Sequence, residues 1–154
     1  MKVTILCGIP GSGKSTYTRK NHPGAFVVSA DNFPGLYETL ETFPVQLKFN
    51  PSLLPAAHGK CLRDFVDVIE DREASILGVS SIVVDNTNTT VAEIAPYAAL
   101  ALAYGHDLEI VTLDCFPEDG ARRNTHGVPL AACIAMHKRL ADRQLPPWWN
   151  HRTV

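Results

Sequence analysis

Gly8-Ile-Pro-Gly-Ser-Gly-Lys-Ser15 fits the pattern G-x-x-x-x-G-K-[ST] at every fixed position. An apolar run at residues 3–7 comes directly before this stretch and predicts a buried parallel strand. The residues that follow, 14–20, predict a helix. A strand, a glycine-rich loop and a helix in this order are the context that a P-loop requires, and they are typical of an α/β fold.

The chemistry of this loop predicts a nucleotide site. Its glycines let the backbone curl so that N–H groups face phosphates, and the next helix adds the positive end of its dipole. Lys14 is expected to reach the β- and γ-phosphates of ATP, and the Ser15 hydroxyl is expected to hold Mg²⁺. The predicted nucleotide-binding residues are Gly8, Ile9, Pro10, Gly11, Ser12, Gly13, Lys14, Ser15 and Thr16.

The rest of the chain alternates between apolar runs and helical patterns. Strands are expected at residues 25–29, 81–84 and 108–113, and helices at 52–77, 96–104 and 129–143. This alternation predicts a three-layer P-loop NTPase or kinase fold with a central, mainly parallel sheet of four to five strands. Residues 31–51 show no clear period and are expected to form a long functional loop.

Length and composition favour one globular domain over residues 1–154, with a lid at about 118–128 and a C-terminal helix and tail at 129–154. The formal net charge of −2 and the pI near 6.3 argue against a protein that coats nucleic acid. The four cysteines contain no C-x-x-C pair, which argues against zinc and favours free thiols. We expect no signal peptide and no membrane span, and therefore a cytoplasmic protein.

Two aspartates follow predicted strands at the sheet edge where ligands bind in doubly wound folds. Asp31 could accept the proton of an attacking hydroxyl or could only shape an Asx turn, and the sequence does not separate these two roles. Asp85 ends an apolar strand, where we favour a carboxylate that acts on Mg²⁺ directly or through water over a helix cap. The predicted metal site is therefore Ser15 with Asp85. Asn86, Thr87 and Asn88 follow and could hydrogen-bond phosphate or substrate.

The predicted lid carries two adjacent arginines, Arg122 and Arg123. Cations over a transferring phosphoryl group are a main source of catalysis, but a solvated basic helix face is an equally good interpretation. His126 lies beside them and, like His58 and His137, is interpreted as structural. Near the C-terminus, Trp148 and Trp149 are expected to cover the end of the sheet rather than to stack on a base.

Together these motifs resemble the P-loop kinases typified by the kinase domain of polynucleotide 5′-kinases, and a broader set of small ATP-binding proteins related to it. The resemblance extends from Lys2 to about Leu140. It rests on the P-loop, Ser29-Ala-Asp31, Val84-Asp-Asn-Thr-Asn88, and Arg122-Arg-Asn-Thr-His-Gly-Val-Pro129 with Met136 downstream.

The resemblance implies ATP-dependent phosphoryl transfer to a hydroxyl, most directly the 5′-hydroxyl end of a DNA or RNA strand. Asp31 takes the place of the general base, and Asp85 that of the aspartate after the third strand. The implied catalytic residues are Lys14, Asp31, Arg122 and Arg123. A nucleoside or small-metabolite kinase and a non-catalytic ATP-binding module remain as alternatives.

One departure concerns the acceptor. Polynucleotide kinases have an arginine shortly after the base aspartate, whereas here Asp31 is followed by Asn32, Phe33 and Pro34. Another cation, such as Lys48 or Arg63, would have to replace it.

Overall fold

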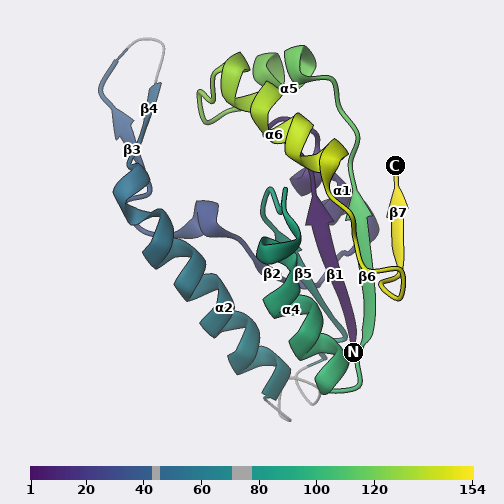
Figure 1. The fold of residues 1–154 in the computed structure, drawn as a ribbon. Helices are drawn as coiled ribbons and strands as arrows, with labels where there is room; N and C mark the ends of the chain where they lie inside the picture. Colours follow the sequence, from purple (N-terminus) through teal and green to yellow (C-terminus); the bar gives the residue numbers. More distant parts are fainter. Residues whose placement is uncertain (43–45, 71–77) are drawn as a thin grey trace.

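The central strand is β1 (Lys2–Cys7), whose last five residues are buried. It pairs in parallel with β5 (Ser81–Asp85) on one side and β6 (Asp107–Thr112) on the other. β2 (Phe26–Val28) and β7 (His151–Thr153) complete the sheet in the order β2-β5-β1-β6-β7, again in parallel (Figure 1). The predicted parallel sheet is thereby confirmed. The computed structural model describes residues 1–42, 46–70 and 78–154.

Helices α2 (Leu54–Glu70) and α4 (Val91–Ala103) cover the larger apolar face of the sheet (Figure 1). The α2 side of this core is a stripe at i, i+4 spacing, which is the spacing that keeps side chains on one helical face. The stripe consists of Ala57, Cys61, Phe65 and Ile69. The Phe65 ring meets Tyr97 of α4 edge to face, with centroids 5.1 Å apart. The predicted continuation of α2 through residues 71–77 lies outside the described residues.

Helix α1 (Lys14–Asn21) lies behind the sheet in Figure 1 and gives the fold its third layer. Its Tyr17 packs against a second, smaller cluster formed by Leu6, Val83, Val111 and Leu113. Because successive strand residues point to opposite faces, β1 sends Ile5 and Leu6 to different cores.

The start of α4 differs from the prediction. The helix begins at Val91, not at Pro96, which lies inside it. The reason is the capping box that the sequence shows: Thr90 Oγ1 accepts from the Glu93 backbone N–H, and the Glu93 carboxylate accepts from Thr90 N–H at 3.0 Å. The cap satisfies N–H groups of the first turn and starts the helix before the proline is reached.

The segment predicted as one long loop is more ordered than expected. It contains the 3₁₀ turn η1 (Ala30–Asn32) and an antiparallel hairpin of β3 (Tyr37–Leu40) and β4 (Gln46–Phe49), then the turn η2 (Pro51–Leu53). The hairpin escaped prediction because its strands are short and half exposed, so no apolar period marks them.

The C-terminal part crosses the carboxyl edge of the sheet and then returns along β6 (Figure 1). Helix α5 (Pro117–Arg123) and helix α6 (Leu130–Asp142) lead to β7, which the sequence did not predict. In the tail, Trp149 packs on the core as expected, whereas Trp148 is 75% exposed. All four cysteines are free, and within the described residues no helix is long and apolar enough to cross a membrane.

Candidate active site

The P-loop joins the end of β1 to the start of α1 at the carboxyl edge of the sheet. Gly13 precedes α1 with a φ of 95°, a left-handed conformation that side chains disfavour, although a Cβ there would meet nothing within 4 Å. Gly13 is therefore required for backbone shape, not for space. Thr16 lies beyond the loop on the exposed surface of α1, where its hydroxyl accepts from Arg19 Nη2 at 3.2 Å.

Gly11 and Gly120 bring the P-loop against helix α5. A Cβ on Gly11, whose φ is 77°, would overlap the carbonyl oxygen of Gly120. In return, a Cβ on Gly120 would stand 2.7 Å from the carbonyl oxygen of Pro10 and 2.6 Å from Cδ1 of Ile9. The two backbones can approach this closely only because both residues lack side chains. Gly11 belongs to the predicted P-loop, whereas Gly120 lies in a polar segment without a motif and was not predicted.

Lys14 and Asp85 form the charged centre of the site. Lys14 Nζ donates to the carbonyl oxygens of Gly8 and Ile9, each at 3.0 Å. Burial lowers the pKa of Lys14, and the carboxylates of Asp85 and Asp31 oppose that change. Burial likewise raises the pKa of Asp85, against the charge of Lys14 and a hydrogen bond with the Ser15 side chain. The residues proposed for phosphate, metal and proton transfer therefore share one electrostatic environment.

The residues present fit a nucleotide with Mg²⁺. Ser12 Oγ is buried and has no hydrogen-bond partner among the described residues, as expected of a loop built to meet phosphate oxygens. Asp85 lies beside Ser15, so one carboxylate and one hydroxyl are available for a metal. No cluster of three or more His, Cys, Asp or Glu side chains occurs in the described ranges. Mg²⁺ suits such a site, because it takes few protein ligands and completes its shell with phosphates and water.

Asn86 and Asn88 follow β5 and hydrogen-bond to the backbone of neighbouring segments at the site. Asn86 Oδ1 accepts from the backbone N–H of Ala30 at 2.9 Å, which ties the end of β5 to the turn that carries Asp31. Asn88, left-handed with a φ of 44°, donates to the Leu6 carbonyl oxygen at 2.7 Å. Both amides thus bond to protein backbone, and their structural role is to hold three strand ends together.

Asp31 stands at the carboxyl end of β2, and its side chain is 52% exposed. Tyr37 of the hairpin donates from its hydroxyl to Asp31 Oδ1 at 3.3 Å. On the other carboxylate oxygen, His126 Nε2 lies 3.4 Å from Oδ2. From the sequence His126 is interpreted as structural, although it lies in the motif at residues 122–129, because a motif does not show which distant residue its histidine contacts. His137 instead faces Asp114 at 3.8 Å, and His58 is exposed on α2.

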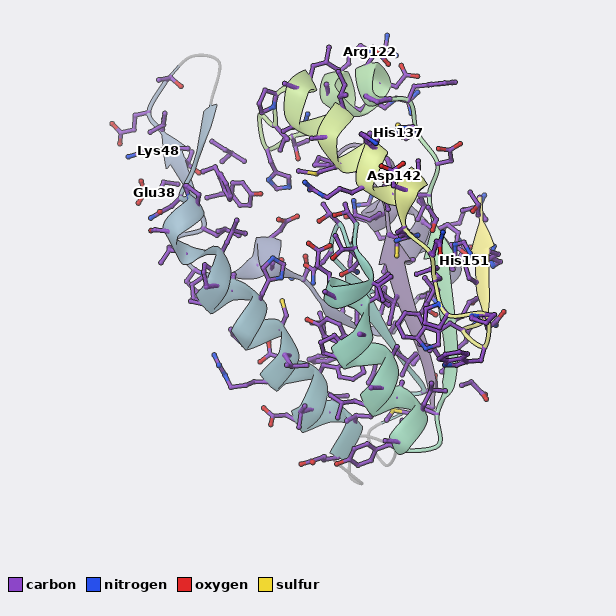
Figure 2. All side chains as sticks on the ribbon, viewed as in Figure 1. Glu38, Lys48, Arg122, His137, Asp142 and His151 are labelled. Atoms are coloured by element: carbon purple, nitrogen blue, oxygen red, sulfur yellow. The ribbon has the colours of Figure 1, made fainter. Side chains whose placement is uncertain are left out.

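The two lid arginines lie in the last turn of α5. Arg122 points outward from the top of the molecule (Figure 2), is 73% exposed, and bonds Asp119 at 2.6 Å. Arg123 is 58% exposed and lies 4.0 Å from the same carboxylate. Gly120 faces the P-loop, and residues three apart on a helix share a face, so the backbone directs Arg123 toward the P-loop side and Arg122 away from it.

A family model described as an AAA domain matches residues 3–126. The chain belongs to the AAA domain family. The match includes the P-loop, Asp31, Asp85 and both lid arginines, and it ends before α6. The human NEDD4-binding protein 2 is 29% identical over 133 residues, which cover 82% of this chain but only 7% of that protein.

Solved structures place this family member among the P-loop kinase folds. A gluconokinase from Sinorhizobium meliloti matches with a TM-score of 0.58 at 14% identity, over 99% of this chain and 81% of the other. An APS kinase from Mycobacterium tuberculosis, solved with AMPPNP and APS, gives 0.53 at 23% identity, over 99% and 87%. These likenesses show the fold, which confirms the α/β kinase-like architecture predicted from the sequence.

After the residues that the family model matches, α6 and its C-cap contribute two arginines that the sequence analysis does not single out, Arg139 and Arg143. Arg139 Nε donates to Thr89 Oγ1 at 3.1 Å, and Arg143 Nη1 donates to the Asn88 carbonyl oxygen at 2.8 Å. Their i, i+4 spacing on the last helix was the available signal. These bonds connect the C-terminal end of α6 to the loop between β5 and α4.

Two cavities lie on either side of the central strand β1, and of their described lining residues only Ile9, in the first cavity, belongs to the P-loop. One, of about 330 Å³, lies between Ile9, the segment that includes Cys115, and His137 of α6. The other, of about 200 Å³, lies beside β2 and α2, where Asn32 and Lys60 are among its polar lining residues. Since β2 and β7 are the two edges of the sheet, the cavities lie on opposite sides of the P-loop.

Proposed function

We propose that this protein transfers the γ-phosphoryl group of ATP to a hydroxyl, and that the acceptor is the 5′-hydroxyl end of a DNA or RNA strand. The observation that carries the proposal is the position of Asp31. An exposed carboxylate stands at the sheet edge, held on both oxygens, and its charge acts on Lys14 and Asp85. A module that only binds nucleotide has no need of a base there.

In the proposed reaction, Asp31 accepts the proton of the acceptor hydroxyl while the hydroxyl oxygen forms a bond to the γ-phosphorus. The bond from that phosphorus to the β–γ bridging oxygen breaks, and ADP leaves with the electron pair. Lys14 and Arg123, the lid arginine on the P-loop side of α5, stabilise the charge on the phosphoryl oxygens. Mg²⁺, held by Ser15 and Asp85, would neutralise charge on the β- and γ-phosphates.

ATP and the hydroxyl substrate would approach the P-loop from opposite edges of the sheet. The cavity of about 330 Å³ beside Ile9 is large enough for the nucleoside part of ATP. Asp31 lies on the other side, after β2, so an acceptor would enter from the hairpin side. Separate approaches for two ligands favour phosphoryl transfer to a second substrate over simple hydrolysis of ATP.

The hairpin supports a nucleic-acid acceptor. Phe49 is 40% exposed and its ring centroid lies 5.4 Å from that of Tyr37, which bonds Asp31. Exposed aromatic rings beside a base carboxylate can stack on the bases of a single strand. The cations suggested by the sequence are less well placed: Lys48 lies 3.9 Å from Glu38 on the hairpin (Figure 2), and Arg63 is exposed on α2. Stacking would take over part of the role of the absent arginine.

A second candidate is a nucleoside or small-metabolite kinase. The observation in its favour is the smaller cavity, whose volume of about 200 Å³ and polar residues suit a compact polyol. Ser29, Lys60 and Asp64 line it, and Lys60 Nζ bonds Asp64 Oδ2 at 2.6 Å. This candidate keeps the chemistry and changes only the acceptor.

A labelling experiment tests the proposal. The protein is incubated with γ-labelled ATP, Mg²⁺, and either 5′-hydroxyl DNA and RNA oligonucleotides or a panel of nucleosides and sugars. We expect label at the 5′ end of an oligonucleotide. Asp31→Asn, which keeps the shape but loses the basic oxygen, should bind an ATP analogue normally and lose roughly 100- to 10,000-fold in rate.

The outcomes separate the candidates. Label on a nucleoside or sugar alone would replace the polynucleotide acceptor with the second candidate. No labelled acceptor of any kind, from protein that binds ATP, would overturn the proposed transfer.

A further inference from the structure

His126 is the described residue that connects the lid to Asp31. It lies in the loop between α5 and α6, 95 positions along the chain from Asp31 (126 − 31), yet its Nε2 is 3.4 Å from Asp31 Oδ2. Tyr37 donates to the other oxygen at 3.3 Å. The carboxylate is therefore held by two side chains from two different elements, the lid loop and the hairpin.

The two holding residues also support each other. The rings of Tyr37 and His126 lie with centroids 4.3 Å apart and planes tilted by 32°, and Tyr37 packs in turn on Phe49. Burial raises the pKa of the Tyr37 hydroxyl, and the charge of Asp31 and their hydrogen bond raise it further. The hydroxyl therefore stays protonated and remains a donor to Asp31 across the physiological range.

The loop that carries His126 is itself fixed. Asn124 Nδ2 donates to the Val128 carbonyl oxygen at 3.1 Å, and Asn124 Oδ1 accepts from Val128 N–H at 2.8 Å. These two bonds close the turn around His126. Asn124 also donates to the Gly120 carbonyl oxygen at 3.3 Å, so the turn is anchored to the helix that packs on the P-loop.

We propose that His126 is a positioning residue for Asp31, and that docking of the lid loop through His126 completes the base. The proposal rests on the proposed function. An aspartate that is half exposed would otherwise sample several rotamers. A general base must lie within hydrogen-bond reach of its proton, and a misplacement of about 1 Å can cost on the order of 100-fold in rate.

Docking of the lid loop through His126 would also link the position of the base, Asp31, to the position of the lid arginine. His126 lies three residues after Arg123, and its loop is anchored to α5, so one docked arrangement of this segment would position the arginine and the imidazole together. Each carboxylate oxygen keeps a further lone pair, so the hydrogen bond from Tyr37 and the contact with His126 leave room for the acceptor hydroxyl. Base and arginine would then be in place only when the lid is closed over the substrate.

The test compares steady-state constants of His126→Leu, His126→Gln and Tyr37→Phe with the wild type, on the acceptor that the wild type labels. His126→Leu should lose about 10- to 100-fold in kcat, with an unchanged KM for ATP and an unchanged melting temperature. His126→Gln should recover most of the rate, because its amide can place an N–H near the position of Nε2. Tyr37→Phe keeps the ring and should lose less. His58→Leu on α2 is the matched control and should change nothing.

The results distinguish this proposal from the proposed function. If the wild type transfers phosphate and His126→Leu is equally fast, the positioning role is wrong while the function stands. Equal losses in the Leu and Gln variants would also overturn it, because a donor would then be irrelevant. A wild type that labels no acceptor would remove the function and the positioning role together.

Discussion

At the scale of single residues, Gly120 is the clearest example of a position set by its neighbour. It lies inside α5, where alanine would ordinarily stabilise a helix by about 1 kcal/mol. Here the new methyl group would meet the Pro10 carbonyl oxygen at 2.7 Å, and backbone cannot move aside as a side chain can. Gly120→Ala should therefore displace the P-loop or the lid and weaken binding of an ATP analogue by about 10-fold or more, measured by calorimetric titration.

Gly59→Ala is the matched control for that change. Gly59 lies inside α2, and a Cβ there would meet only Arg63 Nη1, at an ordinary 3.5 Å. This variant should gain up to about 1 kcal/mol of unfolding free energy and bind the analogue normally. Normal binding by Gly120→Ala would show that the contact of α5 with the P-loop is adaptable.

The two lid arginines should differ in importance. Because α5 turns Gly120 toward the P-loop, Arg123 shares that side and Arg122 does not. Arg123→Ala should cost roughly 10- to 1000-fold in turnover and little in ATP affinity, since the charge is needed most in the transition state. Arg122→Ala should stay within about threefold, because it removes only an exposed pair with Asp119. The opposite ranking in single-turnover rates would contradict this assignment.

Residues with local patterns could be predicted, and residues that act through distant contacts could not. The P-loop is contiguous, so its spacing alone placed Lys14 and Ser15. Asp31 was singled out by its place after a strand, but its neighbours Tyr37 and His126 approach from other elements. No sequence period connects these positions, because their contacts arise only when the hairpin and the lid loop fold against η1.

At the scale of elements, β7 depends on an ion pair at the edge of the sheet. Glu109 of β6 is only 13% exposed and meets Lys2 Nζ at 2.7 Å and Arg152 Nε of β7 at 2.6 Å. Burial alone would raise the pKa of Glu109, but the bonds to Lys2 and Arg152 outweigh it and hold that pKa below its usual range. The strand is short and its residues are exposed, so we expect this charge to secure it.

The sign of the pH dependence follows from the lowered pKa. Glu109 stabilises the fold fully above its unfolded pKa of about 4.3, and that contribution is lost as the pH falls through the lower folded-state value. Glu109→Gln should cost about 1–3 kcal/mol in urea unfolding at pH 7, and the difference from wild type should shrink below about pH 4. Glu38→Gln, in the exposed pair with Lys48, should cost under about 1 kcal/mol. A Glu109→Gln deficit that is the same at every pH would rule out a charge effect.

Elements with a strong apolar period were predictable, and elements stabilised by their partners were not. The strands β1, β5 and β6 were found because buried parallel strands are continuous apolar runs. The hairpin and β7 are largely exposed and carry polar residues. Their backbone hydrogen bonds are made with another strand of the same protein, β3 with β4 and β7 with β6. The sequence shows the capping box Thr90-x-x-Glu93 that starts α4, but a proline is also favoured in a first helical turn, and Pro96 therefore gives a start that is too late.

At the scale of the whole molecule, the sheet order places the P-loop on the central strand with one cavity toward each edge. A ligand in the P-loop would lie where the end of β1, the start of α1 and helix α5 meet, so it would contact elements that are far apart in the sequence. Such a ligand binds the native state and not the unfolded chain, and it should stabilise the molecule by mass action.

The size of that stabilisation is the last prediction. With a non-hydrolysable ATP analogue at 100 times its dissociation constant, the gain is about 2.7 kcal/mol, which for a chain of this length raises Tm by about 5–10 °C. Lys14→Ala should lose the shift, because the cation that meets the β- and γ-phosphates is gone. Lys20→Ala, in the last turn of the same helix, should keep the shift in full. Chelation of Mg²⁺ should reduce it, since Ser15 and Asp85 then hold no metal between protein and phosphates. A full shift in Lys14→Ala would mean that the nucleotide binds elsewhere, and the assignment of the P-loop as the ATP site would be wrong.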